Sequence, residues 1–118
     1  MVERKYRLTG SAEFQRVRRQ GRSWGHPLVV LCALPNGLGR SRFGFLVSQR
    51  VGKAVVRSRL KRLLREAARA HLGEMASGWD VILIARVGTW EANFHQIAEA
   101  VGELLREADL IPCQEITQ

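Results

Sequence analysis

The sequence lacks long apolar segments and closely spaced cysteines, and these absences exclude several classes of protein. The longest apolar runs, Leu28–Leu34 and Val81–Ala85, are too short to span a membrane. The N-terminal residues show no apolar stretch with a cleavage site of the signal-peptide kind. The two cysteines, Cys32 and Cys113, lie far apart and form no CxxC motif. We therefore expect a cytoplasmic protein with free thiols and no membrane partner.

Residues that could build an independent active site are also scarce. The basic part of the chain, residues 1–69, has only Glu3, Glu13 and Glu66 as carboxylates, and these are scattered, whereas metal-assisted phosphodiester hydrolysis needs converging carboxylates. Residues 52–54, Gly-Lys-Ala, lack the upstream glycine and the following Ser or Thr of a phosphate-binding P-loop. The histidines show no metal-ligand spacing and are expected to be ordinary surface or partly buried side chains: His26, His71 and His95. We expect no catalytic residue, metal site, bound cofactor or small-molecule substrate.

Positive charge, in contrast, is abundant and unevenly distributed. The net charge is +8, from 19 Lys and Arg against 11 Asp and Glu. Residues 1–69 hold 17 of the 19 bases and three of the 11 acids, so residues 70–118 are acidic. A surface polarised in this way attracts a polyanion through counterion release. Nucleic acid is the expected partner, and a merely soluble basic protein or an anionic membrane surface remain the alternatives.

Hydrophobic periodicity predicts a helix and two strands in the first part of the chain. The helix begins with Ser11 as its cap, runs to about Gln20 and ends at a left-handed Gly21. Residues 28–34 form an apolar run of strand length, and residues 42–48 alternate apolar side chains onto one face. We expect these two strands to pair as an antiparallel hairpin.

Two helices and a buried strand are predicted in the remainder. After Gly52 the period changes to 3.6 residues, which predicts a helix whose core face is Val56, Leu60, Leu63, Leu64 and Ala67. Residues 80–85 predict a central strand buried on both faces, with Asp80 capping a turn. A last helix, capped by Thr89, has an apolar face of Phe94, Ile97, Val101, Leu104, Leu105 and Ala108. The order α-β-β-α-β-α predicts one α+β domain, a two-layer α/β sandwich with a small mixed sheet, its core at about 4–110 and a tail at 111–118.

The densest chemical signal joins the end of the second strand to the start of the middle helix. From Arg50 through Arg69 there are eight bases, and Glu66 is the one acid. Gly52 lets the backbone turn tightly, and the first amides of the helix point outward as anion donors. The planar fork of arginine matches phosphate oxygens. A solvated charged face is the simpler alternative, but most of these bases lack an acid four residues away.

These segments resemble the bacterial ribonuclease P protein family. The stretch FGFLVSQRVGKAVVRSRLKRLLREAAR is similar to the family signature V-S-K-K-V-G-x-A-V-x-R-N-R-I-K-R, and RLTGSAEFQRVRRQG and GWDVILIAR fit the family in order and spacing, over about residues 4–110. The resemblance implies a cytoplasmic subunit, one per RNA, that binds ribonuclease P RNA and the 5′ leader of precursor tRNA. It implies Mg²⁺-dependent cleavage by the RNA, and a left-handed strand–helix–strand crossover of a type also found in a ribosomal protein. A structured-RNA-binding ribosomal or assembly factor, and a stand-alone nuclease, are the competing hypotheses.

The resemblance also implies two sets of site residues. The contacts to ribonuclease P RNA would be Arg50, Lys53, Arg57, Ser58, Arg59, Lys61, Arg62 and Arg65. The leader cleft would be lined by Phe14, Val17, Arg18 and Cys32. Ser58 departs from the family's Asn and replaces an amide with a hydroxyl. Arg18 and Cys32 stand where related proteins often have aromatic residues, so leader binding would depend more on charge, and Phe14 has an equally good interpretation as a core anchor.

Overall fold

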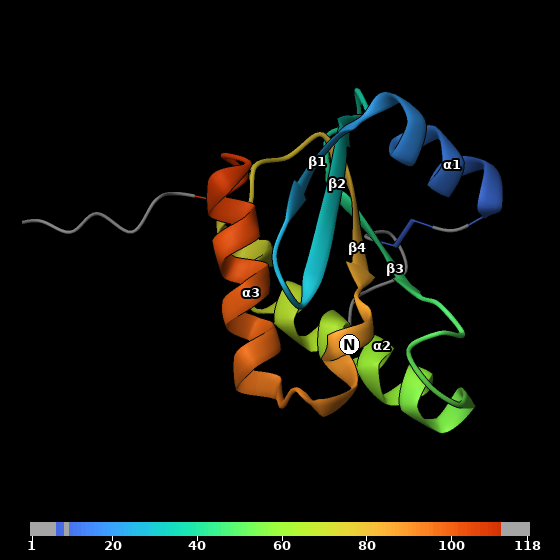
Figure 1. Cartoon of the computed structure of the whole chain (residues 1–118). Coiled ribbons are helices and arrows are strands. Elements are labelled where there is room, and N and C mark those ends of the chain that lie inside the picture. Colours follow the sequence, from blue (N-terminus) through green and yellow to red (C-terminus); the bar gives the residue numbers. More distant parts are fainter. Residues whose placement is uncertain (1–6, 9, 112–118) are drawn as a thin grey trace, which may run out of the picture.

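A four-stranded mixed sheet in the order β1-β2-β4-β3 forms the centre of the protein, whose computed structural model describes residues 7–8 and 10–111 (Figure 1). Along the chain the elements are α1 (Ser11–Gln20), β1 (Arg22–Gly25), β2 (Val29–Pro35), β3 (Arg42–Val47), α2 (Ala54–Arg69), η2 (Leu72–Glu74), β4 (Trp79–Ala85), η3 (Val87–Glu91) and α3 (Phe94–Glu107). Glu3, Cys113 and the predicted tail beyond Ile111 lie outside the described residues. The α+β class and the mixed sheet are confirmed, and the strand β1 is an addition to the predicted order.

The helices cover the two faces of the sheet unequally. Helices α2 and α3 pack on each other and on one face, and α1 lies against β2 and β4 on the other face (Figure 1). The main core fills the space between the sheet and the α2–α3 layer, and its large side chains have almost no exposed surface: Leu31, Phe43, Leu60, Leu64, Leu83, Ile97, Leu104 and Leu105. This layer of sheet and two helices is the predicted two-layer sandwich, and α1 adds cover on the second face.

The predicted hairpin of residues 28–34 with 42–48 is wrong, because β4 lies between these two strands. β4 pairs antiparallel with β2 (Leu31 opposite Leu83) and parallel with β3 (Phe43 opposite Val81). Turn residues after β2 signal a change of direction, but they do not specify that the next strand is the neighbour. β4 has more buried residues than any other described strand, five of its seven, which suits an inner position with a strand on each edge and helices over both faces. Strand β3, helix α2 and strand β4 therefore form the expected crossover between parallel neighbours.

The capping residues at both ends of helix α1 differ from the prediction. The N-cap is Gly10, no side chain caps this end, and Ser11 is the first helical residue. Gly21 is extended, with φ −83°, and not left-handed. Its Cβ position would lie 2.5 Å from the carbonyl oxygen of Ala33, so close approach to β2 requires glycine here.

The start of α3 also differs from the prediction, because Asn93 and not Thr89 is its cap. The Asn93 side chain accepts from the Gln96 amide at 2.9 Å, and the Gln96 side chain accepts from the Asn93 amide at 3.0 Å. Thr89 is buried in the short helix η3. Phe94, placed by periodicity on the core face, is 43% exposed because it is the first residue of the helix. The rest of the predicted apolar face packs in the core.

Asp80 is a fully buried carboxylate that joins three segments of the chain, and not the cap of a turn. It accepts two hydrogen bonds from Arg42 of β3 at 2.8 Å, one from Asn36 at 2.9 Å and one from Arg16 of α1. Burial disfavours the charge of Asp80 and would raise its pKa, but the hydrogen bonds from Arg42, Asn36 and Arg16 together hold the pKa below its usual value. The carboxylate therefore stays ionised and fixes the position of α1 against the sheet.

Replacing Asp80 with Asn is expected to lower the free energy of unfolding at pH 7 by about 3 kcal/mol or more, because two guanidinium groups would lose their buried partner. Urea denaturation of the two proteins measures this difference. The exposed Glu107→Gln is the matched control and should leave the midpoint within error.

The same substitution should alter the dependence of stability on pH. Because the folded pKa of Asp80 is lowered, its contribution is present above the unfolded value of about 3.9 and is lost as the pH falls through the folded pKa. The natural protein should lose stability below about pH 4 more steeply than Asp80→Asn. Parallel acid profiles of the two proteins would contradict a role for the ionised carboxylate.

Candidate nucleic-acid interface

Helix α2 carries six of the eight predicted contacts to RNA, and the other two, Arg50 and Lys53, precede it. Leu60, Leu64, Ala67 and Ala68 have no exposed surface and fix one side of the helix against the sheet and α3. At about 100° per residue, the cations lie in two rows on the flanks of this buried side. The first row consists of Arg57, Lys61 and Arg65, and the second of Arg59 and Arg62. Four of the predicted contacts are exposed and four are partly buried, the exposed ones being Arg50, Lys53, Ser58 and Arg62.

Within residues 7–8 and 10–111, no acid is seen to form an ion pair with either of these two rows. Among the described residues, the ion pairs between arginine and carboxylate involve Arg16, Arg42 and Arg69, and none involves Arg50 or a predicted contact on α2. The ion pair seen on α2 in the described part of the chain joins Arg69 to Glu66 at 3.3 Å, at the end of the helix. The two rows therefore keep a positive field that an external anion would satisfy.

Backbone contacts hold two of these arginines in place. The Arg57 Nε donates to the carbonyl of Gly52 at 3.2 Å, and the Arg59 Nη2 donates to the carbonyl of Ala92 at 3.1 Å. A guanidinium has five N–H donors, so each keeps donors for an external acceptor. The N-terminus of α2 adds to the field, since its cap, Lys53, makes no side-chain capping bond and the first turn has no acid.

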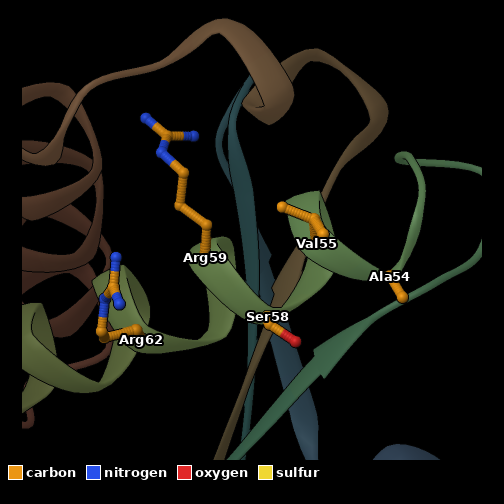
Figure 2. Close-up of a pocket in the computed structure, with 5 residues that line it drawn as sticks. All are labelled: Ala54, Val55, Ser58, Arg59 and Arg62. Atoms are coloured by element: carbon orange, nitrogen blue, oxygen red, sulfur yellow. The ribbon is translucent and has the colours of Figure 1, made fainter.

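A hollow lies on the surface of α2 beside the second row. It has a volume of about 470 Å³ and is lined by Ala54, Val55, Ser58, Arg59 and Arg62. In Figure 2 the side chains of Arg59 and Arg62 extend on one side of the helix, and Ser58 lies at the other edge. Arg59 reaches toward the segment between β4 and α3, in agreement with its bond to Ala92. The serine that replaces the family's Asn thus opens onto the same hollow as two arginines.

Of the four residues assigned to the leader cleft, three belong to α1 and Cys32 belongs to β2 beneath it. Not all four reach the surface. Val17 has no exposed surface and Cys32 is 7% exposed, and both pack with Leu8 and Ile82. Burial raises the pKa of the Cys32 thiol, and the charge of Arg18 offsets part of this effect. Arg18 itself is exposed. Val17 and Cys32 therefore support the packing of α1, and the charge at this place comes from Arg18.

Phe14 is partly buried, and its ring packs directly on the sheet at Gly44. A Cβ on Gly44 would lie 2.5 Å from Cζ of Phe14 and 3.0 Å from its two Cε atoms. The ring fills the space that the side chain of any residue other than glycine would occupy at position 44. Phe14 thus anchors α1 to the sheet and keeps part of its ring accessible.

Beyond α1, a row of apolar side chains on the same face of the sheet is only partly covered. Val30, Ile84 and Leu46 are aligned across β2, β4 and β3, and all three are partly buried. Arg86, two residues after Ile84, is exposed, and its Nη1 lies 3.9 Å from the Cβ position of Gly25 in β1. The sequence reasoning missed Arg86, although the alternation of Ile82, Ile84 and Arg86 places it on this face.

Two features are absent from the part of the chain that the structure describes. No group of three or more His, Cys, Asp and Glu side chains there is placed to hold a metal ion. No helix among these residues is long and apolar enough to cross a lipid bilayer.

Comparison with known proteins places these features in a family. The family model described as ribonuclease P matches residues 2–109. The chain is 44% identical to the ribonuclease P protein component of Herpetosiphon aurantiacus over 109 residues, covering 92% of this chain and 89% of that protein. It is 42% identical to that of Roseiflexus castenholzii over 111 residues, covering 93% and 91%.

Solved structures show the same similarity. The ribonuclease P protein of Staphylococcus aureus superposes with a TM-score of 0.84 at 30% identity, covering 91% of this chain and 98% of that one. The protein from Thermotoga maritima gives a TM-score of 0.79 at 30% identity, covering 86% and 96%. The shared fold therefore extends over nearly the whole chain in both cases.

The contact of Phe14 with Gly44 leads to a stability prediction. Gly44→Ala should destabilise the protein by about 1–3 kcal/mol, because the new methyl group overlaps the Phe14 ring. In the background of Phe14→Ala, the cost of Gly44→Ala should fall by about 1 kcal/mol or more. Urea denaturation of the four proteins of the cycle gives this coupling. Additive effects would mean that the ring does not rest on β3.

Proposed function

Because this chain belongs to the ribonuclease P protein family, we propose that it binds ribonuclease P RNA through α2 and the 5′ leader of precursor tRNA on the α1 side of the sheet. It is a protein subunit of ribonuclease P, the ribonucleoprotein that cleaves tRNA precursors. We assign no step of the cleavage reaction to the side chains of this protein. The observation that carries the assignment of α2 is its two rows of cations without acidic partners among the described residues.

Charge gives the protein a physical role in this assembly. Ribozyme and substrate are both polyanions, and their approach is opposed by electrostatic repulsion. A domain of net charge +8 with basic side chains on two separate surfaces lowers this repulsion and orients the substrate. In this proposal Mg²⁺ and the hydrolytic step belong to the RNA, and the protein raises substrate affinity and lowers the Mg²⁺ concentration that cleavage needs.

The leader is proposed to lie along the partly covered row of Val30, Ile84 and Leu46. This row is apolar and offers surface to bases, while Arg18 and Arg86 are exposed cations for the phosphates. One protein per RNA and a cytoplasmic location complete the proposal. They rest on the family and on thiols that form no CxxC motif.

The α2 surface gives the first binding test. Arg62→Ala and Lys61→Ala, one from each row, should each weaken binding to a ribonuclease P RNA transcript and reduce the log–log salt slope by about one unit, since each loses a phosphate contact. Arg69→Ala is the control on the same helix, because its charge is already paired with Glu66. Equal effects of all three substitutions would mean that net charge, and not the two rows, determines binding.

The second test concerns the leader. The protein with its RNA should bind precursor tRNA more tightly than mature tRNA, and Arg18→Ala or Arg86→Ala should reduce this preference by up to about fivefold. Affinities measured by filter binding at constant salt give the ratio. No preference for the leader in the natural complex would favour a structured-RNA-binding protein of another kind.

A further inference from the structure

Four apolar side chains on α2 and on the η3–α3 segment that contacts it are exposed. They are Val55 at 80%, Val87 at 56%, Trp90 at 53% and Phe94 at 43% of full exposure, and we call them the exposed apolar patch. Val55 lines the hollow itself. The other three lie on η3 and the first turn of α3, and η3 contacts α2. Large apolar groups that gather on a surface mark an interaction site more often than scattered ones do.

The hydrogen bond of Arg59 connects this patch to the basic surface. Arg59 donates to the carbonyl of Ala92, which lies two residues after Trp90 and two before Phe94. Arg59 is therefore tied to the backbone segment that carries both aromatic residues, and Arg62 lines the same hollow as Arg59. A basic side chain is thus bonded to the segment that carries two exposed aromatic side chains, and surfaces that bind single-stranded nucleic acid combine these two kinds of group.

The segment that carries the aromatic residues is firmly held. Thr89 and Ala92 are buried, the Thr89 hydroxyl donates to the carbonyl of Arg86, and the Ala92 amide donates to the carbonyl of Thr89 at 2.9 Å. The capping box of Asn93 and Gln96 fixes the next turn. The exposure of Trp90 and Phe94 thus follows from a defined backbone, with its neighbours turned inward.

We propose that Trp90 and Phe94 stack on unpaired bases of ribonuclease P RNA whose adjacent phosphates are bound by Arg59 and Arg62. This inference rests on the proposed function and specifies the RNA element: a bulge or junction with splayed bases, since a continuous duplex keeps its base faces covered. The charges favour RNA over an apolar protein partner, because such a partner would bury the arginines of the hollow without an anion. Glu91 is the acid of η3, and it is exposed to solvent.

The test compares aromatic and cationic variants in binding to a ribonuclease P RNA transcript in Mg²⁺. Trp90→Ala and Phe94→Ala should each weaken binding by about tenfold and leave the log–log salt slope unchanged, because stacking releases no counterions. Trp90→Phe should retain most of the affinity, since it keeps a ring. Arg62→Ala should lower both affinity and slope. Leu38→Ala, which removes an apolar side chain 39% exposed in the turn after β2, is the control and should bind normally.

The outcomes separate this inference from the function on which it rests. Normal binding by Trp90→Ala and Phe94→Ala together with weak binding by Arg62→Ala overturns the stacking site and leaves the proposed function intact. Normal binding by all three refutes both. If Trp90→Ala leaves RNA binding unchanged and abolishes self-association in sedimentation, the patch is an interface between copies of the chain, and the inference is wrong. Equal thermal unfolding of the variants excludes misfolding as the cause of weak binding.

Discussion

The buried pairing of Asp80 with Arg42 sets the register on which the basic surface depends. The two residues are direct partners in the parallel ladder of β3 and β4, and the chain leaves β3 for the turn that starts α2. A slip of one residue would move Arg42 to the opposite face and leave the carboxylate without its bidentate partner. Arg16 binds the same carboxylate, so the orientation of α1 follows from it too. The positions of both proposed RNA surfaces therefore depend on the buried carboxylate of Asp80.

The two faces of the sheet differ in how completely they are closed. On one side α2 and α3 bury a continuous apolar core, which provides the rigid base from which the arginines of α2 extend. On the other side the single helix α1 covers Cys32 and Ile82 and leaves the row from Val30 to Leu46 partly accessible. In the function proposed above, a small domain thus offers an outer helical surface to one RNA and a sheet surface to another. Rigid support on one side and incomplete cover on the other make this division possible.

Local patterns predicted the elements well, and long-range partners poorly. The existence of α1 and its last residue Gln20, the buried strand and the amphipathic α2 follow from local patterns, whereas the binding of a polyanion by the basic motif stays a prediction. The hairpin was wrong because strand adjacency depends on a segment more than thirty residues away. Asp80 was misjudged because its partners, Arg16 and Arg42, are distant in sequence. The strand Arg22–Gly25 has no apolar alternation, and Arg86 follows an apolar run in an otherwise acidic half.

The inner position of β4 has a consequence for biosynthesis. β1 and β2 pair with each other early, but β3 finds its strand partner, among the described strands, only in residues 79–85. Until that segment emerges from the ribosome, the nascent chain carries nearly all of its positive charge without a completed sheet beneath α2. In a compartment crowded with RNA, nonspecific polyanion contacts compete with folding during this interval. When β4 is available, it pairs with both β2 and β3, completes the sheet and so favours folding over these contacts.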